Sequence, residues 1–337
     1  MRAFSFGLQR QAGLAATHRR SSRQGCAIHV VPIKYVMHIL LIRHDGFGLR
    51  LEIIAAPAGC HNQPSRGRSR ISSRADRRSR RSPNSIHHPM ENYMPNTDRV
   101  ALVTGSGRSI GRAIALRLAA DGARVLVNYK SNAEAAEQVV STIEGAGGQA
   151  AAVQADVTDP VQLALLFDAA EQRYGGLDVF VHNAYGFAAG PIAGASDEDY
   201  ARSFAANSQA TFVAFREAAG RVRDGGRIVY ISSSATRASD PSVSVYSASK
   251  AAGEQLVRTF AREVGPRGIT VNSVLPGPTN TDAMQHMKHM LVERIARTPM
   301  GRFGEPEDIA DVVGFLTSHD ARWVTGQSIA ADGGLTA

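Results

Sequence analysis

The chain has 337 residues, with 38 Lys and Arg against 30 Asp and Glu and a formal net charge of +8. The positive excess lies in residues 1–93, which carry sixteen Lys and Arg and four Asp and Glu, a net charge of +12, so the remainder carries −4. A basic N-terminal segment before an acidic remainder gives no reason to expect nucleic acid at the folded core.

Both cysteines, Cys26 and Cys60, lie in that basic segment. A core without cysteine has no disulfide framework and no thiolate metal site, which is typical of a reducing compartment. The longest apolar run, residues 35–42, contains a histidine and is too short to span a bilayer. We therefore expect a cytoplasmic protein with no membrane partner and no bound metal.

Residues 1–93 are predicted to be an extension of the core. Residues 65–85 are dominated by Arg and Ser and contain too little apolar surface to order themselves. Residues 39–54 are typical of a weak hairpin around Asp45, and an isolated hairpin is marginal in water. The extension is therefore expected to be largely disordered.

Three explanations of the extension stay open. The first is a misassigned start, with Met90 or Met94 as the true beginning, because Met94 precedes the first strand by only a few residues. An organellar transit peptide is the second, since the first 44 residues contain arginines and no acid. A functional basic tail is the third. In each case residues 94–337 form the catalytic domain.

From Arg99 onward, strand and helix patterns alternate along the chain. The strands are predicted at residues 100–103, 124–128, 149–154, 179–181, 227–232, 269–274 and 327–331. The helices between them are predicted at residues 110–120, 133–144, 161–174, 197–219, 246–264 and 307–316. Strands that alternate with helices of ten or more residues form βαβ units. The prediction is one α/β domain with a Rossmann-like, doubly wound parallel sheet of about seven strands.

A glycine-rich turn, Thr104-Gly-Ser-Gly-Arg-Ser-Ile-Gly111, directly follows the first strand. Glycines at such a turn let the backbone approach a pyrophosphate, and the following helix N-terminus supplies N–H donors and a positive dipole end. An ordinary strand–helix turn is the alternative, which the position behind a buried strand disfavours. The expected cofactor contacts here are Gly105, Gly107, Arg108, Ser109, Ile110 and Gly111.

The end of the second strand indicates which dinucleotide binds. A site for NAD has an acid there, which accepts hydrogen bonds from the adenosine ribose. This chain has Asn128, Tyr129 and Lys130 instead. Because Arg108 and Lys130 could both face a 2′-phosphate, we predict NADP(H); the alternative is that both are solvated surface charges.

Two further pairs follow the third and fourth strands. Asp156 and Val157 come after the third, where a carboxylate can accept a hydrogen bond from the adenine amino group. Asn183 and Ala184 come after the fourth, beside the expected position of the cofactor's ribose. Asp and Asn are also ordinary turn formers, so neither pair is decisive alone.

The sequence Tyr-Ser-Ala-Ser-Lys places Tyr246 and Lys250 four residues apart, with Ser233 thirteen positions upstream. With eight tyrosines and four lysines in the chain, this spacing is expected by chance only about 0.1 times. On a helix the two residues share a face, so the ammonium is expected to lower the phenol pKa from its usual value of about 10. Tyr246 could then protonate an alkoxide while Ser233 holds the carbonyl.

Together these residues resemble the short-chain dehydrogenase/reductase family, and especially its 3-oxoacyl-[acyl-carrier-protein] reductase-like members. The resemblance covers about residues 98–334. It rests on Thr104–Gly111, Asp156-Val157, Asn183-Ala184, Asn207, Ser233, Tyr246, Lys250, Pro276-Gly277 with Thr281, and Gly326-Gln327 with Asp332-Gly-Gly334. It implies NADP(H)-dependent reduction of a ketone, with a 3-oxoacyl thioester as one candidate substrate.

The resemblance also implies several residue roles. Lys250 would hold the nicotinamide ribose, and Asn207 would anchor a water in a proton relay, although an Asn packed at a helix interface is the alternative. Further cofactor contacts would come from Pro276, Gly277, Thr279 and Thr281. The implied assembly is a homodimer or homotetramer in which the helices at about 198–219 and 246–264 pair across a two-fold axis.

The chain departs from the family pattern at two places. Ser109 stands where the family has the middle glycine of its loop, and His182-Asn-Ala-Tyr185 replaces Asn-Asn-Ala-Gly. We expect Tyr185 to narrow the substrate pocket; packing against Phe187 is the alternative. Residues 282–303 are Met-rich and are predicted to form a mobile substrate lid.

Two other functions stay open at this point. One is a catalytically silent protein that binds NADP(H) for assembly or sensing, which the complete Ser-Tyr-Lys set disfavours. The other is an enoyl-thioester reductase on the same fold, which would reduce C=C in place of C=O.

Overall fold

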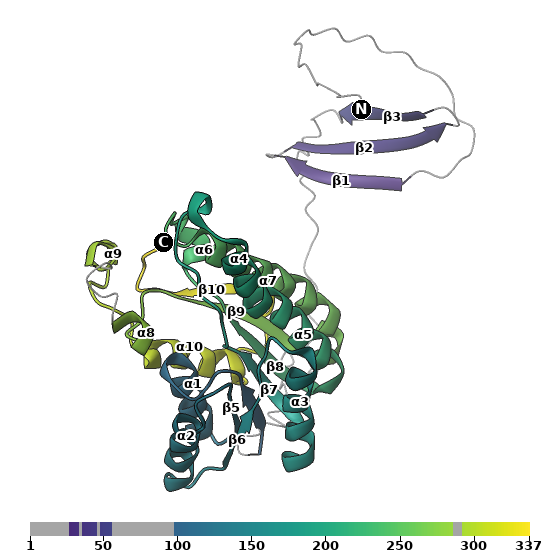
Figure 1. The fold of residues 1–337 in the computed structure, drawn as a ribbon. Coiled ribbons are helices and arrows are strands. Elements are labelled where there is room, and N and C mark those ends of the chain that lie inside the picture. The colour runs from purple at the N-terminus through teal and green to yellow at the C-terminus, as the bar shows by residue number, and fades with distance from the viewer. Residues whose placement is uncertain (1–26, 34–35, 46–47, 56–97, 286–291) are drawn as a thin grey trace, which may run out of the picture. The chain divides into compact units, whose positions relative to one another are not determined.

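The computed structural model describes residues 27–33, 36–45, 48–55, 98–285 and 292–337. The chain divides into two units, residues 1–85 and 86–337. Figure 1 shows the described strands and helices of both. Within the described residues, no helix has the length and apolar character needed to cross a bilayer.

The first unit contains a three-stranded antiparallel sheet in the order β1-β2-β3. Its strands are β1(Ala27–Ile33), β2(Val36–Asp45) and β3(Gly48–Ala55). β2 and β3 pair up to Asp45 opposite Gly48, which confirms the predicted hairpin. β1, the third strand, was not predicted from the sequence, and the disorder predicted for residues 65–85 concerns a segment outside the described residues.

The second unit is built on a seven-stranded parallel sheet in the order β10-β9-β8-β7-β4-β5-β6. The strands are β4(Val100–Val103), β5(Arg124–Tyr129), β6(Ala150–Gln154), β7(Leu177–His182), β8(Val222–Ile231), β9(Thr270–Pro276) and β10(Ser328–Ala331). From β4 the strands β5 and β6 are added on one side, and β7 to β10 are added on the other side, so the order switches between β4 and β7. This order confirms the doubly wound Rossmann-like fold.

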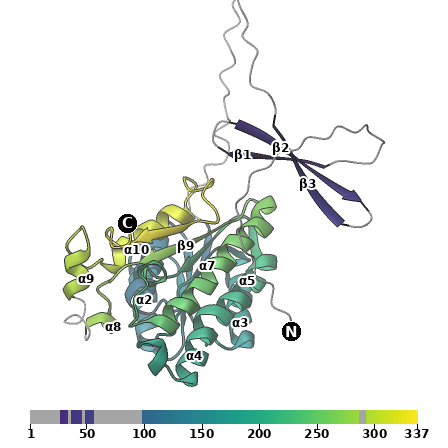
Figure 2. The same cartoon turned by 90° about the horizontal axis from the view of Figure 1, so that it is seen from above.

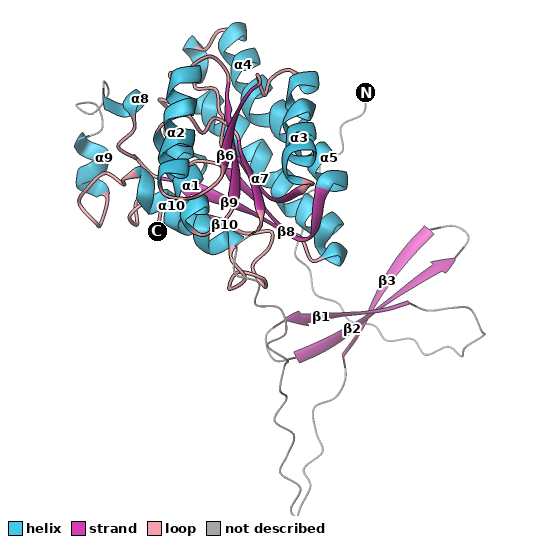
Figure 3. Ribbon diagram, turned by 90° about the horizontal axis from the view of Figure 1, so that it is seen from below, coloured by secondary structure: helices cyan, strands magenta, loops and turns pink. Residues whose placement is uncertain are grey.

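Helices cover both faces of this sheet (Figures 1 and 3). One layer contains α1(Ser109–Ala120), α2(Ala133–Gly145) and α10(Pro306–Thr317). The other contains α3(Pro160–Tyr174), α5(Ala210–Arg221) and α7(Ser244–Val264), which lie on the same side of the sheet in Figure 2. Four short helices complete the unit: α4(Asp197–Phe204), α6(Ala235–Ala238), α8(Asp282–Gln285) and α9(Val292–Arg297).

Local sequence explains where the helices begin and end. Asp159 caps α3 by accepting hydrogen bonds from the backbone N–H groups of Val161 and Gln162, and Pro160 occupies the first helical position. Gly175 ends the helix in the left-handed conformation, with φ 77°.

Two predicted elements differ from the structure. The helix predicted over residues 197–219 is two helices, α4 and α5, joined by a π-helical turn at Ala205–Gln209. Such turns are rare and occur mostly as single-turn insertions inside α-helices, so one continuous helix was the expectation. β8 also begins at Val222, five residues before the strand predicted at residue 227.

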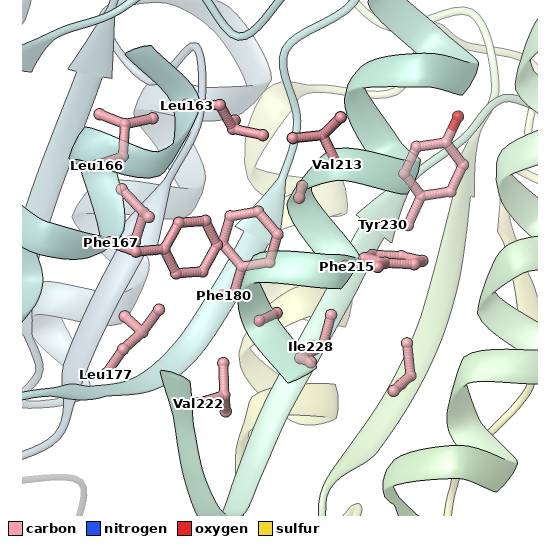
Figure 4. Close-up of a cluster of buried hydrophobic side chains, with 14 of the residues drawn as sticks. Leu163, Leu166, Phe167, Leu177, Phe180, Val213, Phe215, Val222, Ile228 and Tyr230 are labelled. Carbon is pink, nitrogen blue, oxygen red and sulfur yellow. The ribbon is translucent and has the colours of Figure 1, made fainter. Parts of the chain in front are cut away.

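The core between the sheet and the α3-α5-α7 layer combines aliphatic and aromatic side chains (Figure 4). Phe167 and Phe180 meet at a centroid distance of 5.1 Å, and Phe215 stacks on Phe260 at 5.0 Å. Burial of such side chains contributes about 1.5–3 kcal/mol each. This packing fixes β7 and β8, whose carboxyl ends reach the edge of the sheet where a doubly wound fold binds its ligand.

Candidate active site

A cleft of about 1460 Å³ opens at the carboxyl ends of the parallel strands. Its lining includes Ser233 and every residue predicted to contact a cofactor, whereas Asn207 does not line it. These cofactor candidates are Gly105, Gly107, Arg108, Ser109, Ile110, Gly111, Asn128, Tyr129, Lys130, Asp156, Val157, Asn183, Ala184, Tyr246, Lys250, Pro276, Gly277, Thr279 and Thr281.

The glycine-rich turn lies between β4 and α1, and two of its glycines are required, one by its backbone conformation and one by close contacts. Gly105 has φ 61°, a conformation that glycine adopts without strain. A Cβ at Gly111 would lie 2.3 Å from the Gly105 carbonyl oxygen and 2.5 Å from Asn183 Nδ2. The Arg108 side chain makes no capping hydrogen bond at the start of α1, so an anion could accept hydrogen bonds there.

Two buried asparagines hold the backbone of this turn through hydrogen bonds. Asn128 is 1% exposed; its Oδ1 accepts a hydrogen bond from Gly105 N at 3.0 Å, and its Nδ2 donates to Ala155 O at 3.1 Å. Asn183 Nδ2 donates to the carbonyl oxygens of Thr104 and Gly105 at 3.0 and 3.1 Å. Both side chains therefore fix the loop, a role that the sequence analysis did not predict for them.

Lys130, one of the two cations expected to bind a 2′-phosphate, is paired with an acid of the protein. Lys130 Nζ lies 2.7 Å from Asp156 Oδ2. Desolvation alone would raise the pKa of Asp156, but hydrogen bonds from Lys130 and from the N–H and hydroxyl of Thr158 outweigh it and lower that pKa. Arg108 is exposed and lines the same cleft. The two residues predicted to contact separate parts of the cofactor thus contact each other.

The catalytic candidates meet where the end of β8 faces α7. Tyr246 shares a hydrogen bond with the Ser233 side chain. Lys250 is 1% exposed, and its Nζ donates to the Ile231 carbonyl oxygen at 2.7 Å. Desolvation lowers the pKa of Lys250 to about 7, although Glu254 opposes this shift. A lysine of this kind can change its protonation state near neutral pH.

The pKa of Tyr246 is raised, the opposite of the direction expected from sequence. Desolvation of the phenol is the main cause, and the nearby Tyr185 adds to it, while the hydrogen bond to Ser233 lowers the pKa in part. Spacing along a helix shows which residues share a face but does not show the desolvation of the phenol. The expectation that Lys250 would leave Tyr246 with a lowered pKa was therefore wrong for this structure.

The chain matches the family model described as Enoyl-(Acyl carrier protein) reductase over residues 105–336. It is 40% identical over 259 residues to the short chain dehydrogenase claC of Passalora fulva, covering 72% of this chain and 97% of that protein. It is 42% identical over 257 residues to an NADPH-dependent aldehyde reductase-like protein, chloroplastic, of Arabidopsis thaliana, covering 72% and 95%. The solved structure of the angucycline C-6 ketoreductase LanV with bound NADP is similar, with a TM-score of 0.68, 40% identity and coverage of 72% and 97%. The chain belongs to the short-chain dehydrogenase/reductase family.

Membership of the short-chain dehydrogenase/reductase family confirms the resemblance seen in the sequence and makes the protein an oxidoreductase. Its departures from the family pattern can now be placed. Ser109 keeps the left-handed backbone that glycine would adopt freely, with φ 50°. Its hydroxyl donates to Asp282 Oδ2 at 3.2 Å, which ties the glycine-rich turn to α8.

Tyr185, the second departure, is 51% exposed and lines the cleft. Its ring packs edge-on against Tyr246 at a centroid distance of 6.5 Å, and Phe187 does the same from another position at 5.0 Å. Lys250 Nζ lies 5.7 Å from the centroid of the Tyr185 ring. These contacts place an aromatic wall beside the candidate proton donor.

Asn207, the family's proton-relay position, lies in the π-helical turn and is fully buried. Its Oδ1 accepts from Gly186 N at 3.1 Å, and its Nδ2 donates to Gly186 O at 2.7 Å and to Ser249 Oγ at 2.9 Å. These bonds favour the interface role for the side chain. Its backbone carbonyl accepts a hydrogen bond from the Tyr230 hydroxyl at 3.3 Å.

The end of β9 forms another wall of the cleft. A Cβ at Gly277 would lie 2.7 Å from the Cα of Asp332, so the two segments meet backbone to backbone. Thr279 Oγ1 donates to Gly277 O at 2.9 Å, and Thr281 N donates to Thr279 O at 2.8 Å. The turn that carries the predicted cofactor contacts Pro276, Gly277, Thr279 and Thr281 therefore has a defined conformation.

The predicted lid is described only in part, because residues 286–291 lie outside the described residues. Arg294 of α9 forms an ion pair with Asp240, which precedes α7. This pair and the contact between Ser109 and Asp282 join segments far apart in the chain, so no local pattern could have indicated them. Among the residues that the structure describes, no group of three or more His, Cys, Asp or Glu could hold a metal ion.

Proposed function

We propose that the protein is an NADP(H)-dependent reductase that converts a ketone to a secondary alcohol, with Tyr246 as the general acid. The observation that carries this proposal is the meeting of Ser233, Tyr246 and Lys250 in the same cleft as the glycine-rich turn. NADPH supplies a hydride from its nicotinamide ring when bound. Every other step is assigned to side chains of the protein.

Ser233 and Tyr246 would both hydrogen-bond the substrate carbonyl oxygen, since both side chains line the same cleft and Ser233 lowers the pKa of Tyr246 in part. Tyr246 would give its proton to that oxygen as negative charge develops there. A phenol with a raised pKa holds its proton firmly until an alkoxide, a stronger base, is formed. Lys250 would stabilise the phenolate left behind.

Two features of the cleft fit NADP(H): the glycine-rich turn and the positive charge near the end of β5. Gly105, Gly107 and Gly111 line the cleft at the start of α1, where a pyrophosphate can bind. Arg108 and Lys130 provide positive charge, and β5 ends in Tyr129 without an acid for the ribose hydroxyls of NAD. LanV carries NADP in its solved structure, which supports the same choice here.

A carbonyl substrate is favoured over an enoyl thioester, although the matched family model is described as an enoyl reductase. Two hydroxyl donors that converge on one point suit an oxygen that gains charge. A 3-oxoacyl thioester stays among the candidate ketones. NADPH oxidation should be measured with acetoacetyl thioester, crotonyl thioester and a panel of cyclic ketones. Oxidation with crotonyl thioester alone would overturn the proposal, and no oxidation with any of them would favour the silent binder.

Residues 94–337 are proposed to be the complete catalytic domain, assembled as a homodimer or homotetramer in the cytoplasm. Every residue that lines the cleft in the described part of the chain lies in this range. An organellar location is the alternative, if residues 1–93 are a transit peptide. A protein without residues 1–93 should be active and should elute as an oligomer in size-exclusion chromatography. An inactive or aggregated product would contradict this domain boundary.

A further inference from the structure

A buried carboxylate lies directly behind the catalytic groups. Glu254 of α7 is 7% exposed and Ser232 at the end of β8 is 4% exposed. Ser232 Oγ donates a hydrogen bond to Glu254 Oε1 at 2.6 Å. Burying a carboxylate is costly unless other groups compensate for the lost hydration. Glu254 does not line the cleft, so contact with a ligand does not explain its presence.

The two residues beside Ser232 make the contacts of the candidate active site. On one side, Ile231 O accepts the hydrogen bond from Lys250 Nζ. On the other, Ser233 bonds to Tyr246. Three consecutive residues of β8 and its end thus contact three successive turns of α7, because Tyr246, Lys250 and Glu254 are spaced four residues apart. The contact between Ser232 and Glu254 therefore fixes the alignment in which the other two form.

The charge of Glu254 also acts on Lys250. The titratable groups around the lysine are His182 of β7, Tyr185 of the following loop, Tyr230 of β8, and Tyr246 and Glu254 of α7. Burial and the lysine charge lower the pKa of His182 to about 3, so this ring is neutral at pH 7. Burial raises the pKa of each of the three tyrosines, which are therefore neutral as well. Within this group, Glu254 alone can balance the ammonium.

We propose that Glu254 is a positioning residue that keeps Lys250 protonated, and that Ser232 holds the Glu254 carboxylate in place for this purpose. The proposal deepens the proposed reductase function and rests on it. Lys250 is half protonated near pH 7, since desolvation lowers its pKa to about 7 even with Glu254 present. Without the carboxylate the pKa would fall further, and the ammonium would be lost at a lower pH.

The test is Glu254→Gln, which removes the charge and keeps an oxygen that can accept the Ser232 hydrogen bond. The alkaline limb of the kcat profile for ketone reduction should move by about one pH unit to lower pH, so kcat falls about tenfold at pH 8 and stays close to the wild-type value at pH 5.5. Glu263→Gln makes the same change at an exposed position of the same helix and should leave the profile unchanged. A fall in kcat by the same factor at every pH, or no change, would overturn the proposal.

A second measurement needs no substrate. The chain has four lysines, so 13C NMR of lysine labelled at Cε can follow the titration of Lys250, with Lys250→Arg to assign its signal. Glu254→Gln should lower the measured pKa of Lys250, and an unchanged pKa would overturn the proposal even if no ketone is reduced. If Glu254→Gln does not fold, Ser232→Ala replaces it. This variant leaves the carboxylate without its hydroxyl donor and should move the kcat profile in the same direction by a smaller amount.

Discussion

The two ends of the cleft are built differently. At the cofactor end, buried asparagines bond to the backbone of the glycine-rich turn, and glycines occupy positions where a Cβ would clash. At the substrate end, the contacts are side chain to side chain: the ion pair of Arg294 with Asp240 and the packing of the Tyr185 ring against Tyr246. Exchange of an asparagine or a glycine at the cofactor end would disturb the backbone of the turn, whereas an exchange at the substrate end changes only the side chains that a substrate meets. Reaction type should therefore be set at the first end and at the β8–α7 contact, and substrate choice at the second.

The strongest test of this contrast is Tyr246→Phe, which removes the proton donor and keeps the ring between Tyr185 and Phe187. We expect kcat to fall by about 10²–10⁴-fold with NADPH affinity retained, because the variant loses general acid catalysis alone. Stopped-flow measurement of NADPH oxidation and fluorescence titration of NADPH would separate the two effects. Near-normal turnover would show that another group donates the proton.

The next test asks whether the cations at the cofactor end recognise a 2′-phosphate. Arg108→Ala with Lys130→Ala should raise the Kd for NADPH at least about tenfold and leave the Kd for NADH nearly unchanged, because only NADPH carries a 2′-phosphate for these cations to pair with. Arg112→Ala, an exposed cation one turn along α1, is the matched control. Equal losses for both cofactors would mean that these residues do not distinguish them. Asp156→Asn should act in the opposite direction, since it releases Lys130 from its ion pair.

A smaller effect is expected at the substrate end. Tyr185→Ala should increase kcat/KM for bulky cyclic ketones relative to acetoacetyl thioester by about tenfold, because it removes a ring that narrows the cleft. Tyr200→Ala is a control of the same size, since Tyr200 is exposed outside the cleft and stacks on Phe204. An unchanged preference would mean that Tyr185 supports Tyr246 without limiting the substrate.

The same contrast explains what the sequence could predict. The seven strands, the glycine-rich turn and the spacing of Tyr246 and Lys250 are local patterns, so the fold and the set of residues at the cleft followed from them. Asn128 was expected to contact the cofactor, but it also supports the turn through hydrogen bonds to segments 23 and 27 residues away. The sign of the Tyr246 pKa shift depends on burial by residues from several elements. Neither property can be read from spacing along one helix.

The smallest expected effect concerns Ser109, whose positive φ a glycine would adopt freely. Ser109→Gly and Ser109→Ala both remove the hydroxyl that bonds to Asp282, so their difference isolates the backbone. An alanine in the left-handed region costs about 1–2 kcal/mol, and the greater freedom of glycine in the unfolded chain offsets part of this. The glycine variant should therefore be more stable than the alanine variant by about 1 kcal/mol in urea unfolding. Equal stability would mean that the turn does not keep this conformation in solution, and Ser109 would then have no fixed geometry from which to hold α8.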